Sequence, residues 1–296
     1  MVYTKSPLKP NPYGIIKTNK GKPGIVSTLY AVYKPLDHVY SEFVQIYFEQ
    51  DARMNNYMHP LVNKGAKNDM KVSNENALKG EVCFPSRDEQ IKISEYFAKL
   101  DHLITLHQRK CDETKELKKY MLQKMFPKNG ERVPEIRFAG FTADWEQRKV
   151  SEIANRHDNL RVPVAASERV PGSTPYYGAN GIQDYVDGYT HDGEFVLIAE
   201  DGANDLKNYP VQYTTGKIWV NNHAHVLQGK EKITDNKFLG YSINATNIES
   251  LLVGGGRAKL NAEVLMGIEL LMPSYLEQCR ISEFLFNLDH LITLHQ

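Results

Sequence analysis

Nine consecutive residues, Leu-Asp-His-Leu-Ile-Thr-Leu-His-Gln, occur twice in this chain, at 100–108 and at 288–296. Weaker identities precede both copies at the same separation, without gaps. Pro85-Ser86 matches Pro273-Ser274, and Ile93-Ser94-Glu95 matches Ile281-Ser282-Glu283. A repeat of this kind indicates one structural unit used twice. The second copy stops where the first continues. We therefore expect this chain to be part of a longer two-repeat protein, truncated at both ends.

Each copy opens with a helix signal. Ser86-x-x-Glu89 and Ser274-x-x-Glu277 fit a capping box behind a proline. Behind the first box, steps of four and three connect Ile93, Phe97, Leu100, Ile104, His107, Cys111, Thr114, Lys118, Met121 and Met125. This spacing predicts a coiled-coil seam on a helix about 60 Å long. We expect Phe97, Leu100, Ile104 and Met121 to contact a partner helix or a second copy; the alternative is a lone surface helix.

Composition excludes several classes of protein. The chain has 36 basic and 36 acidic residues, and no apolar run reaches the length of a membrane span. Residues 1–84 hold 11 basic and 7 acidic residues, whereas residues 150–272 hold 10 and 15. A nonspecific nucleic-acid binder would be basic throughout, so any DNA contact must come from local clusters. Three cysteines without metal-ligand spacing indicate a reducing, cytoplasmic setting.

The chain divides into four predicted segments. Residues 1–84 form a partial domain, 85–130 a long helix, 131–272 a complete domain, and 273–296 the start of a second helix. Strand-like runs occur at 24–26, 195–199 and 217–220, a probable helix covers 41–50, and turns are expected at Asp187-Gly188, Asp192-Gly193 and Asp201-Gly202. The helix-like run 42–47 corresponds to 237–241, and the loop 64–67 to 254–259. The partial domain therefore repeats the later part of the complete one.

These features together resemble the specificity subunit of type I restriction–modification systems. The resemblance covers essentially the whole chain. It is carried by the Pro-x-x-x-Glu-Gln-x-x-Ile entry into both helices, Pro134-Glu135-Ile136-Arg137-Phe138 with Trp145, Pro175-Tyr176-Tyr177-Gly178, and Trp219-Val220-Asn221-Asn222. The resemblance implies an α+β fold, with mixed α/β target recognition domains joined by long helices that form an antiparallel coiled coil.

The resemblance also implies function and partners. Two target recognition domains would each read half of a split site in double-stranded DNA, and the helices would set the gap between the half-sites. The subunit itself would be non-catalytic and hold no metal or cofactor. It would direct adenine methylation and cleavage by methyltransferase subunits, which carry S-adenosylmethionine, and by a motor-nuclease subunit, which uses ATP and magnesium.

Polar and basic loop residues are the candidates for DNA contact. Reading the major groove needs paired donors and acceptors, and phosphate contacts need cations or close backbone approach. In the complete domain the candidates are Tyr176, Tyr177, Asn180, Gln183, Lys217, Asn221, Asn222, His223, His225, Arg257 and Lys259. In the partial domain they are Lys5, Lys9 and Asn11.

Other functions are weaker alternatives. Asn11-Pro12-Tyr13 lacks the second proline of an adenine methyltransferase loop. His223-x-His225 would place two imidazoles on one side of a strand, but no third metal ligand has a suitable spacing. A coiled-coil assembly protein with protein-binding domains remains the alternative function, and a silent specificity cassette is another.

Overall fold

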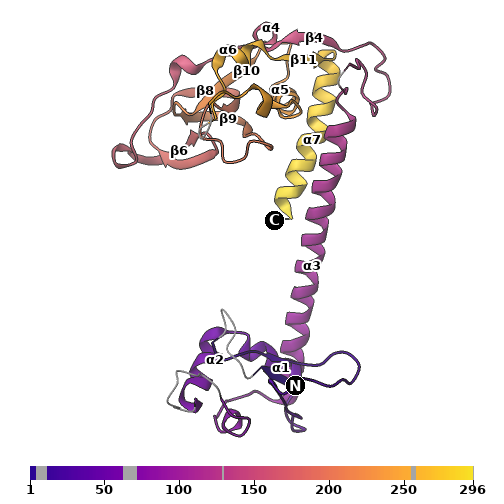
Figure 1. Cartoon of the computed structure of the whole chain (residues 1–296), viewed down its shortest axis with the longest axis vertical. Helices are drawn as coiled ribbons and strands as arrows, with labels where there is room; N and C mark the ends of the chain where they lie inside the picture. Colours follow the sequence, from indigo (N-terminus) through magenta and orange to yellow (C-terminus); the bar gives the residue numbers. More distant parts are fainter. Residues whose placement is uncertain (5–11, 63–71, 129, 255–257, 296) are drawn as a thin grey trace. The chain divides into compact units, whose positions relative to one another are not determined.

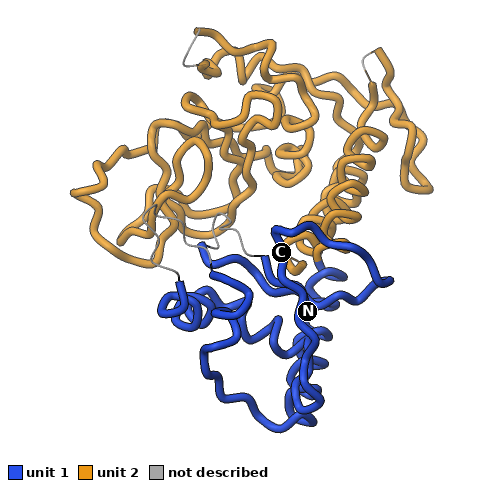
Figure 2. The backbone as a smooth tube through the Cα atoms, turned by 60° about the horizontal axis from the view of Figure 1, so that its bottom comes forward, with its two compact units in different colours: residues 1–107 blue, residues 108–296 orange. Residues whose placement is uncertain are grey.

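The computed structural model describes residues 1–4, 12–62, 72–128, 130–254 and 258–295 (Figure 1). The chain forms two compact units, Met1–His107 and Gln108–Gln296 (Figure 2). The boundary falls inside the long helix α3 (Arg87–Lys124), so each unit includes part of this helix. Helices and strands occur in both units, which confirms the predicted α+β class. None of the helices among the described residues is long and apolar enough to cross a bilayer.

Unit 1 is a small antiparallel sheet packed with two short helices. The sheet has the order β2-β1-β3, and Tyr3, Phe48 and Met58 are buried in the core. Its elements are β1 (Val2–Thr4), β2 (Ile16–Lys17), β3 (Tyr30–Val32), α1 (Ser41–Phe48), α2 (Asp51–Met58), η1 (His59–Leu61) and η2 (Asn76–Leu78). The predicted helix over 41–50 is confirmed as α1. The predicted strand at 24–26 is wrong: no described strand pairs with it, and Ile25 is fully exposed.

Unit 2 holds a six-stranded sheet with the order β5-β10-β8-β9-β6-β7 and a two-stranded sheet, β11-β4. Its strands are β4 (Glu146–Lys149), β5 (Ala154–Arg156), β6 (Pro171–Gly178), β7 (Gly181–Val186), β8 (His191–Ala199), β9 (Val211–Val220), β10 (Ala224–Gly229) and β11 (Glu269–Met272). Its helices are α4 (Val150–Ile153), η3 (Asp158–Leu160), η4 (Ala166–Glu168), α5 (Asn236–Asn244), η5 (Ile248–Leu251), α6 (Ala262–Gly267) and α7 (Tyr275–Leu294).

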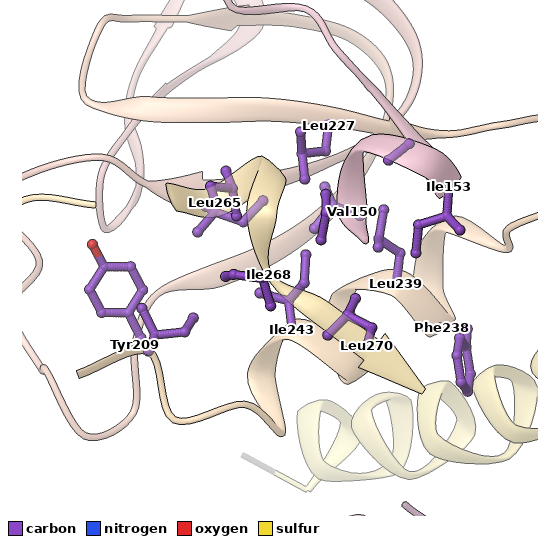
Figure 3. Packing of buried hydrophobic residues seen from close by; sticks show 14 of the residues in the cluster. Val150, Ile153, Tyr209, Leu227, Phe238, Leu239, Ile243, Leu265, Ile268 and Leu270 are labelled. Atoms are coloured by element: carbon purple, nitrogen blue, oxygen red, sulfur yellow. The ribbon is translucent and has the colours of Figure 1, made fainter. Parts of the chain in front are cut away.

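Strand β8 is buried on both of its faces. Val196 and Ile198 belong to the main core, while Phe195 and Leu197 belong to a second cluster with Ile218. This alternation follows the period of two of a β-strand. Figure 3 shows part of the main core, in which Leu239, Ile243 and Leu270 gather and Phe238 lies beside α7. The strands predicted at 195–199 and 217–220 are confirmed within β8 and β9.

The turn predicted at Asp192-Gly193 is wrong, because these residues lie inside β8. Asp192 pairs with Lys217, and Gly193 pairs with Gly216, in an unbroken antiparallel register. Gly193 has φ 144°, a value that glycine adopts without penalty and that lets the strand continue. An Asp-Gly pair therefore predicts a turn only where no neighbouring strand provides hydrogen bonds for it.

Helices α3 and α7 pack antiparallel within unit 2. Cys111 Sγ lies 3.8 Å from the Ile292 carbonyl oxygen, and Lys118 pairs with Asp289. Residue numbers therefore increase along α3 where they decrease along α7, as in an antiparallel pair. Cys111 and Thr114, two members of the predicted seam, are buried. Phe97 and Ile104, farther toward the start of α3, are 43% and 54% exposed. The predicted antiparallel helix pair is confirmed for the part of the seam that α7 covers.

Candidate nucleic-acid interface

The loops after β6, β8 and β9 meet at one edge of the large sheet. Strands β6 and β9 are parallel, with Tyr177 beside Val220, so the residues that follow them lie at the same edge. Asn180 follows β6; its side chain donates to the Gly202 carbonyl and accepts from the Asn204 amide, both at 2.9 Å. His223 follows β9, and its Nδ1 lies 2.6 Å from Asp201 Oδ1. We call Asn180, Asp201, Asn222, His223 and Lys259 the polar edge.

A network of charged groups supports this edge. His225 Nδ1 lies 2.7 Å from Asp158 Oδ2, and its Nε2 lies 2.8 Å from the Leu260 carbonyl oxygen. Both ring nitrogens therefore lie within hydrogen-bonding distance of an oxygen atom. Glu200 accepts from Arg161 Nη1 at 2.7 Å and forms an ion pair with Lys259 Nζ at 2.8 Å. Cations and carboxylates thus alternate through the network, as burial of charge requires.

The two carboxylates of the network remain ionised. Burial raises the pKa of Asp158, but hydrogen bonds from His225 and from the Val226 amide outweigh it, and the net pKa is lowered. Burial likewise raises the pKa of Glu200, and its contacts with Lys259 and Arg161 again bring the net pKa below the ordinary value. The network therefore holds ionised carboxylates at neutral pH.

Three members of the network have the spacing of metal ligands. One ligand atom each from Asp158, Glu200 and His225 lies within 4.8 Å of the others. However, both Asp158 oxygens accept hydrogen bonds, from His225 and from the Val226 amide, and the Glu200 oxygens contact Arg161 and Lys259. Cationic side chains thus occupy the place that a metal ion would take, and this donor set fits an ion-pair network better than a metal centre.

The two histidines expected to share a strand face have separate roles. His223 lies in the turn before β10 and contacts Asp201, whereas His225 lies within β10 and contacts Asp158. The turn removes His223 from the strand, so the alternation assumed for a strand does not apply. The prediction that both imidazoles lie on one side of a strand is therefore wrong.

Four residues expected to contact DNA are buried. Tyr176 is 1% exposed, its hydroxyl accepts from the Val164 amide at 3.0 Å, and Arg169 lies 4.1 Å over its ring. The Tyr177 hydroxyl accepts from Thr214 at 3.2 Å. The residues below 10% exposure are Tyr176, Tyr177, Asn221 and His225. We therefore correct their role to positioning of loops, because a buried side chain cannot reach a base edge.

The other candidates are exposed or half-buried. Gln183 lies on the edge strand β7, and Lys217 Nζ lies 4.6 Å over the Tyr189 ring. The structure brings Asn180, Asn222, His223 and Lys259 together at the polar edge. Their contact with DNA stays a prediction. The remaining candidates, Lys5, Lys9, Asn11 and Arg257, lie outside the described residues.

Sequence reasoning missed the acidic partners of the site. Asp158, Glu200 and Asp201 were not candidates, although they hold His225, Lys259 and His223. A signal was present for Glu200 and Asp201, which directly follow the apolar run 195–199. Polar residues at the end of a buried strand are well placed to form a site. Asp158 carries no comparable signal.

Comparison with known proteins identifies relatives of this chain. The family model described as the type I restriction modification DNA specificity domain matches residues 142–296. A specificity subunit of a type I restriction enzyme, so named in Haemophilus influenzae, is 46% identical over 158 residues, which are 53% of this chain and 40% of that protein. The chain therefore matches less than half the length of this relative.

Two further relatives cover more of the chain. A type I specificity subunit, so named in Mycoplasma pneumoniae, is 26% identical over 215 residues, which are 71% of this chain and 76% of that protein. The crystal structure of a type I restriction–modification S subunit from M. genitalium superposes with a TM-score of 0.61. That comparison has 13% identity and covers 87% of this chain and 68% of the other. At this identity the structural match shows a shared fold.

Proposed function

The chain belongs to the type I restriction modification DNA specificity family, and we propose that it recognises a DNA sequence on behalf of partner subunits. In this proposal the chain is not catalytic. Residues 131–272 read one half of a bipartite site, and the α3–α7 pair contributes to the spacer. Methyltransferase subunits methylate adenine with S-adenosylmethionine, and a motor-nuclease subunit cleaves DNA with ATP and magnesium. A cytoplasmic location fits these partners.

The observation that carries this proposal is the polar edge. It combines an exposed amide, Asn222, with a half-buried imidazole, His223, and an ammonium group, Lys259, 45% exposed. Asparagine can bind adenine through two hydrogen bonds, and lysine contacts phosphate or guanine. Asn180 instead holds the loop at Gly202 and Asn204, which makes it a positioning residue. We therefore propose Asn222 as a base contact and Lys259 as a phosphate contact.

Acidic neighbours limit the electrostatic part of DNA binding. Lys259 is held by Glu200, and Asp201 lies on the same edge. Phosphates near these carboxylates are repelled, so few contacts add to affinity and the salt dependence is shallow. Recognition at this edge then rests on hydrogen bonds to bases more than on charge.

Lysine substitution tests the phosphate contact. We expect Lys259→Ala with Arg257→Ala to weaken binding to all duplex sequences about equally. The slope of log K against log salt should fall by about 1 for each phosphate that is no longer neutralised. Fluorescence anisotropy at several salt concentrations measures both quantities. Lys232→Ala is the matched control, because Lys232 is exposed beyond the far end of β10. An unchanged slope in the double variant would refute the phosphate contact.

A further inference from the structure

The turn that joins β9 to β10 is held by hydrogen bonds to its neighbours. The Asn221 amide donates to the carbonyl of Tyr177 in β6 at 3.0 Å. The Asn221 side chain accepts from the His223 amide at 2.8 Å, and Asn221 is only 4% exposed. The His223 carbonyl accepts from the amide of Glu200, the residue after β8, at 2.9 Å. These contacts fix the backbone of His223, so its ring has a defined place at the polar edge.

The two ring nitrogens of His223 have different surroundings. Nδ1 lies 2.6 Å from Asp201 Oδ1. Nε2 has no hydrogen-bond partner among the residues that the structure describes, and it is not one of the buried side-chain atoms that lack a partner. The side chain as a whole is 36% exposed. Nδ1 is therefore engaged by Asp201, whereas Nε2 is open to a ligand at the polar edge.

The contact with Asp201 determines whether Nε2 donates or accepts a hydrogen bond. A carboxylate only accepts hydrogen bonds, so Nδ1 carries the proton that it donates to Asp201. In a neutral imidazole the other nitrogen then holds a lone pair and accepts. Asp201 therefore makes the exposed nitrogen of His223 an acceptor.

We propose that His223 reads an exocyclic amino group in the major groove of DNA, and that Asp201 is the positioning residue that gives the ring this ability. The N6 group of adenine and the N4 group of cytosine are the amino groups that the bases present there, whereas guanine and thymine present acceptors. An acceptor at Nε2 can pair only with the amino groups. This inference rests on the proposed recognition of DNA and specifies the chemical group read at one position of the motif.

A phosphate contact fits His223 less well than a base contact. Phosphate oxygens are acceptors, so a phosphate needs a donor from the protein. The neutral ring held by Asp201 offers no donor at Nε2, and the nearby carboxylate repels phosphates. Lys259, whose side chain is 45% exposed, is a donor that the same edge offers to phosphate. Base and phosphate contacts thus fall on different side chains.

Two substitutions separate the roles of the two ring nitrogens. Asparagine places its amide near the position of Nδ1, so His223→Asn can keep the contact with Asp201 but loses Nε2. Glutamine reaches the position of Nε2 and offers an acceptor there, so His223→Gln keeps the reading atom. The preference for the motif is measured at about pH 8, where an imidazole is neutral. We expect His223→Asn to lower the preference over unrelated duplexes about tenfold. His223→Gln should retain more of this preference than His223→Asn.

A double-mutant cycle with altered DNA identifies the amino group. The motif is first mapped with the unaltered full chain and its methyltransferase partner. Duplexes are then made in which hydrogen replaces the amino group of one adenine or cytosine at a time, and fluorescence anisotropy gives the affinity of the complex for each. At one position, loss of the amino group and His223→Asn should each weaken binding about tenfold, and both together should cost little more than either alone.

Asp201→Asn tests the positioning role. The amide that replaces the carboxylate can donate to Nδ1 or accept from it, so the ring is no longer held in one tautomer. We expect the preference to weaken at the same position of the motif, while the affinity for unrelated duplexes does not fall. A purely structural defect would lower both affinities. His102→Asn is the matched control and should change neither, because His102 is an exposed histidine on α3.

Three results would overturn this inference. His223→Asn could leave the preference for the motif unchanged, it could weaken binding to all duplexes equally, or no amino group of the motif could be coupled to His223. In each of these cases the unaltered chain still selects its motif, so the proposed recognition of DNA would stand. If the unaltered chain selects no motif, the proposed recognition itself is refuted, and this inference with it.

Discussion

Replacing Arg137 by alanine is expected to lower the free energy of unfolding of unit 2 by about 3–5 kcal/mol. Arg137 binds both oxygens of Glu277, which is 1% exposed, and its Nη2 also donates to the Ala143 carbonyl at 2.7 Å. Removal of the guanidinium leaves a buried carboxylate without its counter-charge. The penalty for that uncompensated charge exceeds the value of the hydrogen bonds themselves.

Urea unfolding followed by tryptophan fluorescence measures this effect, because Trp145 is buried in the core that α7 joins. The double variant Arg137→Gln with Glu277→Gln should recover part of the stability, since neither charge then remains buried. Arg148→Ala is the matched control: its pair with Glu146 is exposed on both sides, so we expect no measurable change. An Arg137→Ala variant as stable as Arg148→Ala would contradict this account of the helix entry.

The substitution Asp158→Asn should lower the free energy of unfolding by about 3 kcal/mol at neutral pH. The Asp158 carboxylate is 11% exposed and contacts His225 Nδ1 and the Val226 amide. The substitution keeps the shape of the side chain but removes the buried negative charge that His225 and Arg161 contact. The network under the polar edge would then keep the cations Arg161 and Lys259 but only one of its two carboxylates, Glu200.

The pKa of Asp158 gives this variant a defined pH dependence. Burial raises the pKa, but the hydrogen bonds from His225 and Val226 outweigh burial, so the folded pKa lies below the ordinary value of an aspartate. A group with a lowered folded pKa stabilises the protein above its unfolded pKa and loses this effect as pH falls through the folded pKa. The difference between Asp158→Asn and the unaltered chain should therefore be full at pH 7 and shrink below about pH 4.

Unfolding curves from neutral pH down to about pH 3, below the ordinary aspartate pKa, test this expectation. Asp192→Asn is the control, because Asp192 is an exposed aspartate in the same domain, for which no comparable destabilisation is expected. If Asp158→Asn is as stable as the unaltered chain at neutral pH, or is destabilised equally at every pH, the carboxylate is not the counter-charge that the network requires.

The long helix and the repeat could be predicted because their signals are local. Capping at Ser86 and Ser274, and apolar spacing every three or four residues, depend only on nearby positions. The observed helices start at Arg87 and Tyr275, directly after these serines. In a complete capping box the Glu277 side chain would accept a hydrogen bond from the backbone amide of Ser274. Here the Glu277 carboxylate binds Arg137 instead. That partner comes from 140 residues earlier (277 − 137), and no local rule identifies it.

The candidate site could be predicted only in part, because burial is a tertiary property. Asn180, Asn222, His223 and Lys259 were expected near DNA from their type and loop setting, and the structure gathers them at one edge. Tyr176 and His225 are residue types that often contact bases from a protein surface, but here their exposed fractions are below 2%. Asp158 pairs with His225 across 67 residues (225 − 158). Such pairing depends on how β10 docks beside η3, which no spacing in the sequence encodes.

The unequal burial of one repeat in two units bears on how this chain assembles. The same residue types occur at the starts of α3 and α7. Among the described residues, only the start of α7 is covered by a connector, which includes Arg137. The apolar seam taken alone favours self-association. In unit 2 the contacts at the helix start come from an arginine and an aromatic ring, since Arg137 pairs with Glu277 and Phe138 packs against Phe284.

The central claim, that this chain selects the DNA sequence on which its partners act, is tested most directly by mapping DNA methylation. Cells without a methylation system of their own would express the partner methyltransferase with and without this chain. We predict one adenine-methylated motif that depends on the chain and that changes or disappears with Asn222→Ala, while Lys232→Ala leaves it intact. A methylation pattern that is identical with and without the chain, or no motif in either case, would contradict the claim.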